Sequence, residues 1–292
     1  MPDADAAGVL ASSAGLIMRG AAGRARGENF PVALRLLPGS RRRHLAAVYC
    51  FTRSADNMGD EAPPTQRLAL LGQLADDIRR LYRPGDAGPQ LAVTRALAPA
   101  VAQCAIPARP FLDLIEANCQ DQRVSRYRTF GDLLAYCRLS ANPVGRIVLH
   151  IFGAATPHRE ALSDRVCTAL QLAEHWQDVA EDLRAGRIYL PGEDMDRFGC
   201  TEADLAAATA GPAVRALVEF ETGRAGALLD DGAPIIGSLS GAARAAVAGY
   251  VAGGRAALAA IAASGYDVLA AAPRPRGRRV AAELLRAYLK GR

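Results

Sequence analysis

Apolar residues recur every three or four positions along most of the 292-residue chain, which is the spacing of an amphipathic helix. Strand-like alternation is nearly absent, and no Asn-Gly or Asp-Gly turn separates two strand-like runs. The predicted helices, which end at proline and glycine breaks, span residues 40–61, 64–82, 88–104, 108–121, 129–153, 158–184, 212–231, 238–264 and 277–290. We therefore expect an all-α fold, with a loose N-terminal segment at 1–27 and a single helical domain at 28–292.

Composition excludes several classes of protein. Half of the residues are hydrophobic, so extensive disorder is not expected. The net charge is +5, and Lys290 is the only lysine among 35 basic residues, a bias typical of a GC-rich genome. Dense basic runs occur only at 41–43 and 274–279, where a solvated turn or contact with a membrane surface is the simpler interpretation. We therefore predict no nucleic-acid partner.

The cysteines and the apolar stretches bear on location. The six cysteines form no C-x-x-C motif and no zinc-type cluster, and most lie among apolar residues as small core side chains. That usage suits a reducing cytoplasm. The alanine-rich stretch 241–263 is interrupted by Arg244 and Arg255, so no membrane span is predicted. With no signal peptide expected, the prediction is a cytoplasmic protein, and peripheral membrane association stays open.

Polar side chains form a stripe along two of the predicted helices. Tyr49, Arg53, Asp56 and Asp60 stand at offsets 0, 4, 7 and 11, and Gln171, Glu174, Asp178 and Asp182 stand at offsets 0, 3, 7 and 11. These spacings place each set on one helix face, whereas the other faces of both helices are apolar. Each stripe ends in two aspartates that lie one helical turn apart.

Two aspartates on one face repel each other unless a cation bridges them or water screens them. A solvated surface is the simpler interpretation of either pair alone. Two matching stripes, with Arg184 and Arg187 just beyond the second, favour a site instead. Mg²⁺ prefers oxygen ligands shared between carboxylates and phosphates, and arginine binds diphosphate oxygens in a fork. The pattern indicates ionisation of an allylic diphosphate beside dry walls that protect a carbocation.

At these motifs the chain resembles the squalene/phytoene synthase family. The segments that carry the resemblance are "AVYCFTRSADNMGD", "YRTFGDLLAYCRLSANPVG", "QLAEHWQDVAEDLRAGRIYLP" and "SGYDVL", within about residues 28–270. The resemblance implies an isoprenoid synthase (terpenoid synthase) fold, helical around a central cavity. It also implies a prenyl diphosphate as the small-molecule substrate and Mg²⁺ as the cofactor.

The resemblance also assigns roles by position. It implies that Asp56, Asp60, Asp178 and Asp182 hold Mg²⁺, and that Asn29, Phe30, Tyr49, Arg53, Gln171, Arg187 and Tyr189 line the diphosphate site. Glu174 stands where the family usually has asparagine, and it either adds a metal ligand or faces water.

Within the family, "ENFPVALRLLP" and "CRLSANPVG" look most like the hydroxysqualene synthases of bacterial hopanoid biosynthesis. This branch implies loss of diphosphate from presqualene diphosphate, rearrangement, and capture of water to give hydroxysqualene, so NADPH is not expected. Contact with the inner membrane or with neighbouring pathway enzymes stays open. Two alternatives are a head-to-head synthase that forms presqualene diphosphate or phytoene, and a non-catalytic family-like assembly factor.

Three positions depart from the family pattern. Asn57 replaces the second of two adjacent aspartates, which leaves the spacing of the first pair intact. Leu139 stands where squalene-forming members usually have tyrosine, which puts cyclopropane formation from two farnesyl diphosphates in doubt. Asn142 stands at a family glycine, where it either orients a catalytic water or caps a kink before Pro143.

Three further aromatic side chains lie near the motifs. His175 sits beside the second stripe, but a lone histidine in a helix is more often packed or solvated than functional. Tyr127 and Tyr136 are expected in the core, with a place in the pocket wall as the alternative.

Overall fold

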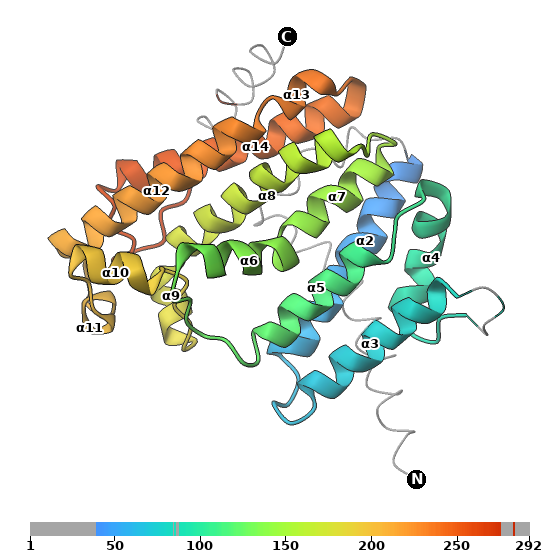
Figure 1. The fold of residues 1–292 in the computed structure, drawn as a ribbon, viewed down its shortest axis with the longest axis horizontal. Helices are drawn as coiled ribbons and strands as arrows, with labels where there is room; N and C mark the ends of the chain where they lie inside the picture. The colour runs from blue at the N-terminus through green and yellow to red at the C-terminus, as the bar shows by residue number, and fades with distance from the viewer. Residues whose placement is uncertain (1–38, 84, 86–87, 276–282, 284–292) are drawn as a thin grey trace. The chain divides into compact units, whose positions relative to one another are not determined.

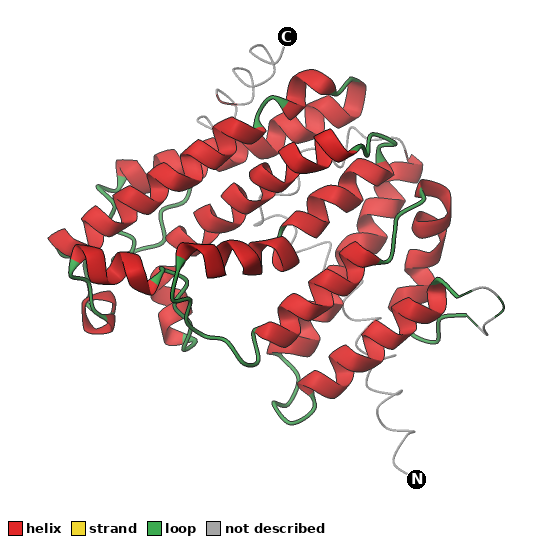
Figure 2. Cartoon of the chain, in the orientation of Figure 1, coloured by secondary structure: helices red, strands yellow, loops and turns green. Residues whose placement is uncertain are grey.

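The computed structural model describes residues 39–83, 85, 88–275 and 283. In this part of the chain the regular elements are helices joined by loops, and the only β-type pairing is one isolated parallel bridge between Arg126 and Ile188 (Figure 1, Figure 2). The prediction of an all-α fold is confirmed. The predicted N-terminal segment and all but residue 283 of the predicted helix 277–290 lie outside the described residues. The single domain and its central cavity stay predictions.

The contacts divide the chain into two units. Unit 1 comprises the described residues up to Arg123 together with Ile147–Ala154. Its helices are α2 (Gly39–Asp60), α3 (Arg67–Leu81), α4 (Ala92–Cys104) and α5 (Arg109–Gln120). Helix α2 packs on the other three, and α3 packs on α4 and α5.

The core of unit 1 follows from the apolar spacing. Leu71, Leu74 and Ile78 recur at intervals of three and four on α3, and all three are fully buried. Phe51 of α2 meets Phe111 of α5 edge to face, with ring centroids 5.2 Å apart. These contacts hold α2 and α5 side by side, which places the first aspartate pair next to polar side chains of α5.

Unit 2 comprises Val124–Arg146 and the described residues from Ala155 onward. Its helices are α6 (Phe130–Ser140), α8 (Pro157–Gln177), α9 (Val179–Arg184), α10 (Gly192–Phe198), α11 (Glu202–Leu205), α12 (Pro212–Gly232), α13 (Ile235–Ser238) and α14 (Gly241–Ala263). Helix α8 packs on α6, α12 and α14, and α12 packs on α14 (Figure 1). Helix α7 (Asn142–Ile151) begins among the residues of unit 2 and ends among those of unit 1.

Local chemistry explains where the central helices of unit 2 begin. Thr129 accepts a hydrogen bond from the Asp132 amide and Asp132 caps in return, a capping box that starts α6. Thr156 caps α8, and Pro157 occupies its first turn, where a missing N–H costs nothing. Helix α8 and helix α12 approach closely at Gly232, which faces the carbonyl oxygen of Leu162.

Two predicted helices are each broken in the structure, which corrects the predicted boundaries. The predicted helix 129–153 divides at Ala141 into α6 and α7, because Pro143 cannot continue the hydrogen-bond ladder. The predicted helix 158–184 divides at Asp178 into α8 and α9. The short helices α10, α11 and α13 were not predicted.

Helix α14 is the one described helix that is long and apolar enough to cross a membrane by length and composition. The prediction of no span rested on Arg244 and Arg255, but an 18-residue window still passes that test. However, 61% of the window is buried inside the protein, and α14 packs on α8 and α12. This burial is what a core helix shows.

Candidate active site

The first aspartate pair lies at the end of helix α2 in unit 1. Asp56 is half-buried, whereas Asp60, the last residue of the helix, is exposed. The Arg53 guanidinium lies 4.0 Å from the Asp56 carboxylate, one turn earlier on the same helix. Tyr49 begins this stripe and is partly buried. The structure thus keeps the predicted stripe on one continuous helix.

Helix α5 supports the first aspartate from the side. Asn118 Nδ2 donates to Asp56 Oδ1 at 3.3 Å, and Gln122 Nε2 donates to the Gly59 carbonyl at 3.0 Å. A Cβ at Gly59 would lie 2.7 Å from Asn118 Oδ1, so glycine is what allows Asn118 to approach. The Asp56 carboxylate is therefore oriented by a neighbour 62 positions away in the chain.

Arg67 secures the C-terminal end of α2. Its Nη2 donates to the Asp60 carbonyl at 2.8 Å and its Nε donates to the Ala62 carbonyl at 2.8 Å. Its Nη1 donates to Gln122 Oε1 at 3.3 Å, and Gln122, two residues beyond the end of α5, donates to the Asn118 carbonyl at 3.0 Å. The bond to Asp60 satisfies a carbonyl group that the helix end leaves without an intrahelical partner, and the bond to Ala62 fixes the turn that follows. Sequence reasoning missed Arg67, Asn118 and Gln122, since none has a motif of its own.

The second aspartate pair lies at the break between α8 and α9 in unit 2. Asp178 is the residue between the two helices, and the Asp182 amide still donates to the Asp178 carbonyl at 2.8 Å. The two aspartates therefore stay one turn apart, as predicted, although the helix is not continuous. Glu174, one turn before Asp178 on α8, is exposed.

The segment after α14 returns to Asp178. Arg274 Nη2 donates to Asp178 Oδ1 at 2.9 Å, and the neighbouring Gln177 donates to the Pro273 carbonyl. Burial raises the pKa of Asp178, the positive charge of Arg274 opposes that rise, and Glu181 adds to it. Burial therefore disfavours the anionic form of Asp178, and the positive charge of Arg274 offsets part of that cost.

A strap of residues 186–193 follows α9 and runs beside residues 125–130. The Ile188 amide donates to the Ser125 carbonyl at 2.9 Å, and the Gly192 amide donates to the Tyr127 carbonyl at 2.9 Å. Arg126 adds a 2.7 Å bond to the Gly186 carbonyl. Gly186 has a φ of 82°, the left-handed conformation that ends α9 and turns the chain back. The strap is therefore fixed at both ends.

The strap carries Tyr189 into a cluster of aromatic rings. Its ring stacks on the imidazole of His175 with centroids 3.7 Å apart and 14° between the planes. Tyr127 and Tyr136 lie at centroid distances of 5.8 Å from Tyr189, and all four side chains are buried. The core prediction for Tyr127 and Tyr136 is confirmed, and His175 is packed rather than solvated. What sequence reasoning missed is the stack of His175 on Tyr189.

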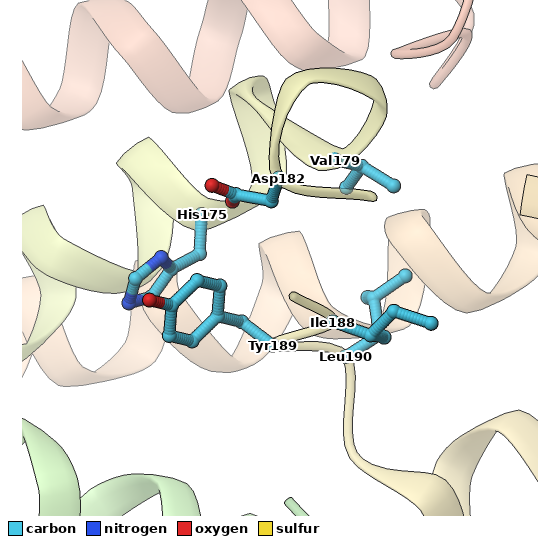
Figure 3. A pocket seen from close by; sticks show the side chains of 6 residues that line it. All are labelled: His175, Val179, Asp182, Ile188, Tyr189 and Leu190. Atoms are coloured by element: carbon cyan, nitrogen blue, oxygen red, sulfur yellow. The ribbon is translucent and has the colours of Figure 1, made fainter. Parts of the chain in front are cut away.

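A small recess opens beside these rings. Its volume is about 10 Å³, which is room for about one water molecule, and it is lined by His175, Val179, Asp182, Ile188, Tyr189 and Leu190. Figure 3 shows the His175 and Tyr189 rings on one side of the recess and the aliphatic side chains on the other. An aspartate, two aromatic rings and three aliphatic groups thus surround a recess that is polar on one part of its lining and apolar on the rest.

Two further predicted site residues connect to His175. Gln171 Nε2 lies 3.2 Å from His175 Nε2, one turn away on α8. Burial lowers the pKa of His175 to about 3, and the positive charge of Arg187 contributes to the shift. The imidazole is therefore neutral at physiological pH. Unit 2 thus brings Gln171, Asp182 and Tyr189 together around His175.

Asn142 is buried at the start of α7. Its Oδ1 accepts a 2.9 Å hydrogen bond from the Thr168 hydroxyl of α8. It also stands directly after the α6–α7 break and before Pro143, as the kink interpretation expected. Its role toward water stays a prediction. Asn29 and Phe30 lie outside the described residues.

The donor sets fit a magnesium ion that shares its ligands with a substrate. No group of three or more histidine, cysteine, aspartate or glutamate side chains that could hold a metal occurs among the described residues. Mg²⁺ commonly binds one or two carboxylates and takes its other ligands from water and phosphates. Each unit offers one aspartate pair, and the leading aspartate of each pair faces a guanidinium.

Comparisons with known proteins agree on one family. A family model for squalene/phytoene synthase matches residues 24–286. A hydroxysqualene synthase of Rhodopseudomonas palustris is 33% identical over 217 residues, covering 73% of this chain and 72% of that protein. A presqualene diphosphate synthase of the same organism is 36% identical over 209 residues, covering 68% and 74%.

Solved structures give the same result for the fold. The squalene synthase HpnC from Alicyclobacillus acidocaldarius matches with a TM-score of 0.78 and 41% identity, over 88% of this chain and 95% of that one. A dehydrosqualene synthase solved in complex with a ligand matches with a TM-score of 0.82 and 25% identity, over 97% and 98%. The helices described above are therefore those of a squalene synthase-like, terpenoid synthase fold.

Proposed function

The chain belongs to the squalene/phytoene synthase family, and we propose that it converts presqualene diphosphate and water to hydroxysqualene and inorganic diphosphate. The observation that carries this proposal is the similarity to hydroxysqualene synthases, at 33% identity over 73% of the chain, together with both aspartate pairs. The family membership makes the chain an enzyme of isoprenoid biosynthesis. The particular substrate, product and hopanoid pathway are the proposal.

The four aspartates are proposed to hold Mg²⁺ together with the substrate diphosphate. When bound, Mg²⁺ would neutralise the charge of the departing diphosphate. Asp56 is suited to this because Asn118 orients its carboxylate, and Asp178 because burial disfavours its anionic form, which a bound cation would stabilise. Tyr49, Arg53, Gln171, Arg187 and Tyr189 are proposed to line the diphosphate site. Glu174 is a further candidate ligand for Mg²⁺.

The aromatic and aliphatic side chains of unit 2 are proposed to protect the cationic carbon skeleton. Tyr189 stacks on His175, and the negative quadrupoles of the buried tyrosine rings are proposed to favour a nearby positive charge. Val179, Ile188 and Leu190 line the same recess, and these apolar side chains are proposed to restrict the access of water to the cation.

Capture of water ends the proposed reaction. The carbon–oxygen bond to diphosphate breaks, the cyclopropane ring opens, water adds its oxygen to the allylic cation, and one proton leaves. No hydride enters this balance, which is why NADPH is not expected. Asn142 is proposed to orient the water; because Thr168 holds its carbonyl oxygen, the contact with water would run through the amide nitrogen.

A second candidate function is formation of presqualene diphosphate from two farnesyl diphosphates. The 36% identity to a presqualene diphosphate synthase favours it. Leu139, at the position where squalene-forming members usually have tyrosine, disfavours it. A cytoplasmic location also stays a proposal, which the cysteine usage supports. Peripheral contact with the inner membrane and contact with pathway enzymes are proposed because the substrate and product are hydrophobic.

The experiment that tests the proposal is product analysis with three substrates. Purified protein is incubated with Mg²⁺ and presqualene, farnesyl or geranylgeranyl diphosphate, and the products are separated by chromatography and mass spectrometry. We expect presqualene diphosphate to be converted to hydroxysqualene, and we expect no product from farnesyl or geranylgeranyl diphosphate. Conversion of farnesyl diphosphate without presqualene diphosphate would support the second candidate. Normal turnover by both Asp56→Asn and Asp178→Asn would contradict the assigned metal site, and no turnover of any substrate would favour a non-catalytic protein.

A further inference from the structure

His175 contacts two residues of the proposed diphosphate site at once. Its Nε2 lies 3.2 Å from the amide nitrogen of Gln171, and its ring stacks on Tyr189 at a centroid distance of 3.7 Å. It also lines the recess that contains Asp182 (Figure 3). The side chain is only 7% exposed, so these contacts take up most of its surface.

The Gln171 amide is placed with its nitrogen toward the His175 ring, and this placement sets the direction of the hydrogen bond. An amide nitrogen carries two hydrogens and does not accept, so Gln171 Nε2 donates and the imidazole Nε2 accepts. The proton of the neutral ring is then on Nδ1. Burial and the charge of Arg187, which lower the pKa of His175, agree with a neutral ring that can accept.

We infer that His175 is a positioning residue for the diphosphate site, because it fixes the amide of Gln171 by a hydrogen bond and the ring of Tyr189 by stacking. The inference rests on the proposed function, since it concerns how a prenyl diphosphate meets these two side chains. With Nε2 held by His175, the Gln171 carbonyl oxygen and its second N–H face away from the ring. A diphosphate with its bound cation then meets one amide orientation instead of two.

At this position histidine combines a ring that stacks on Tyr189 with a ring nitrogen that accepts from Gln171. A phenylalanine at this position would keep a ring against Tyr189 but would have no acceptor for Gln171. An asparagine would keep an acceptor near Gln171 but would lose the stack. The variants His175→Phe and His175→Asn therefore separate the two contacts. His158→Phe is the matched control, because the same change is then made at an exposed position in the first turn of α8.

The test is a double-mutant cycle between His175 and Gln171. Full-length wild type, His175→Phe, Gln171→Ala and the double variant are titrated with inorganic diphosphate in the presence of Mg²⁺ by calorimetry. Steady-state kinetics with presqualene diphosphate are measured on the same preparations, and circular dichroism confirms that each variant is folded. His175→Asn provides a second measurement if His175→Phe does not fold.

In the wild-type background, His175→Phe is expected to weaken diphosphate binding about fivefold, as the loss of one hydrogen bond would. The corresponding rise is in KM, because Gln171 binds the diphosphate before and during reaction. In the Gln171→Ala background the same change is expected to alter the affinity less than twofold, because the partner is gone. His175→Asn is expected to lower kcat through the loss of the stack on Tyr189, and His158→Phe to behave as wild type.

Two results would overturn the inference about His175 without contradicting the proposed function. One is a folded His175→Phe variant, or a folded His175→Asn variant, with wild-type diphosphate affinity, KM and kcat. The other is an effect of His175→Phe that is equally large with and without Gln171. A wild-type protein that binds no diphosphate in the presence of Mg²⁺ instead contradicts the proposed function, and the inference is then lost with it.

Discussion

Arg274 donates a 2.9 Å hydrogen bond to Asp178, the first aspartate of the second pair. The guanidinium and a metal ion would compete for the same carboxylate. We therefore predict that Arg274→Ala raises the affinity of the substrate-free protein for Mg²⁺ about two- to fivefold, which is the size of a partly exposed ion pair. Calorimetric titration with MgCl₂ measures the change.

A second variant tests whether the positive charge at position 274 causes the change in Mg²⁺ affinity. Arg274→Lys keeps the positive charge and is expected to bind Mg²⁺ as the wild type does. An Arg274→Ala variant with unchanged or weaker Mg²⁺ binding would mean that the guanidinium does not compete at Asp178.

Gly59 is predicted to control the orientation of Asp56. In Gly59→Ala the new methyl group would stand 2.7 Å from Asn118 Oδ1, so the Asn118 side chain has to turn and its bond to Asp56 is lost. We expect several-fold weaker Mg²⁺ binding with a change in unfolding free energy of about 1 kcal/mol or less. Gly72→Ala on α3 meets no neighbour within 4 Å and serves as the control. Equal Mg²⁺ affinity in both variants would show that Asn118 does not position Asp56.

Gly232 is predicted to be essential for the packing of α12 on α8. A Cβ there would lie 2.8 Å from the Leu162 carbonyl oxygen and 2.9 Å from the Val166 amide nitrogen, both backbone atoms that cannot turn aside. Gly232→Ala should therefore lower the unfolding free energy by about 1–3 kcal/mol. Gly223→Ala, on the same helix with open space around it, should raise it by about 0.5–1 kcal/mol. Urea denaturation distinguishes the two, and similar midpoints would refute the close contact.

Glu221 is predicted to make stability depend on pH. It is fully buried on α12, and burial raises its pKa to about 8, with the Asp194 carboxylate adding to the rise and Arg224 opposing it. Between about pH 4.5 and pH 8 the folded protein therefore keeps the proton on the Glu221 carboxyl group, whereas the unfolded chain has released it. This contribution to stability is complete below about pH 4.5 and is lost as the pH rises through about 8.

In the structure Arg224 Nη1 donates to Glu221 Oε1 at 3.1 Å. The variant Glu221→Gln cannot titrate, but the amide oxygen of the new glutamine can still accept this hydrogen bond. We expect the variant to be more stable than the wild type by about 1–3 kcal/mol at pH 8, and the difference to shrink towards pH 5. Thermal melts at several pH values measure it. A difference that is constant from pH 5 to pH 8 would contradict the raised pKa.

The periodic spacing of apolar residues predicted the long helices because it reports which face of a helix is buried. It did not predict the break at Asp178, where no proline or glycine interrupts the pattern. The short helix α11 did have a local signal, since Thr201 and Asp204 form a capping box. The predicted helices 64–82 and 88–104 begin three and four residues too early. In the structure α3 begins at Arg67 and α4 at Ala92, and the residues before each helix form turns or loops.

The aspartate spacings were visible because helical neighbours are close in sequence. The partners that orient them were not visible, because Asn118 and Arg274 reach their aspartates from 62 and 96 positions away. The stack of His175 on Tyr189 likewise depends on the strap folding back along residues 125–130. Such contacts are set by tertiary packing, and no local pattern records them.

The central claim is that this chain captures water after presqualene diphosphate has lost its diphosphate. The most direct measurement is to incubate the protein with presqualene diphosphate and Mg²⁺ in ¹⁸O-labelled water and to analyse the organic product by mass spectrometry. The account predicts hydroxysqualene that carries one ¹⁸O atom in its hydroxyl group. Unlabelled hydroxysqualene, or squalene and dehydrosqualene without the alcohol, would contradict it.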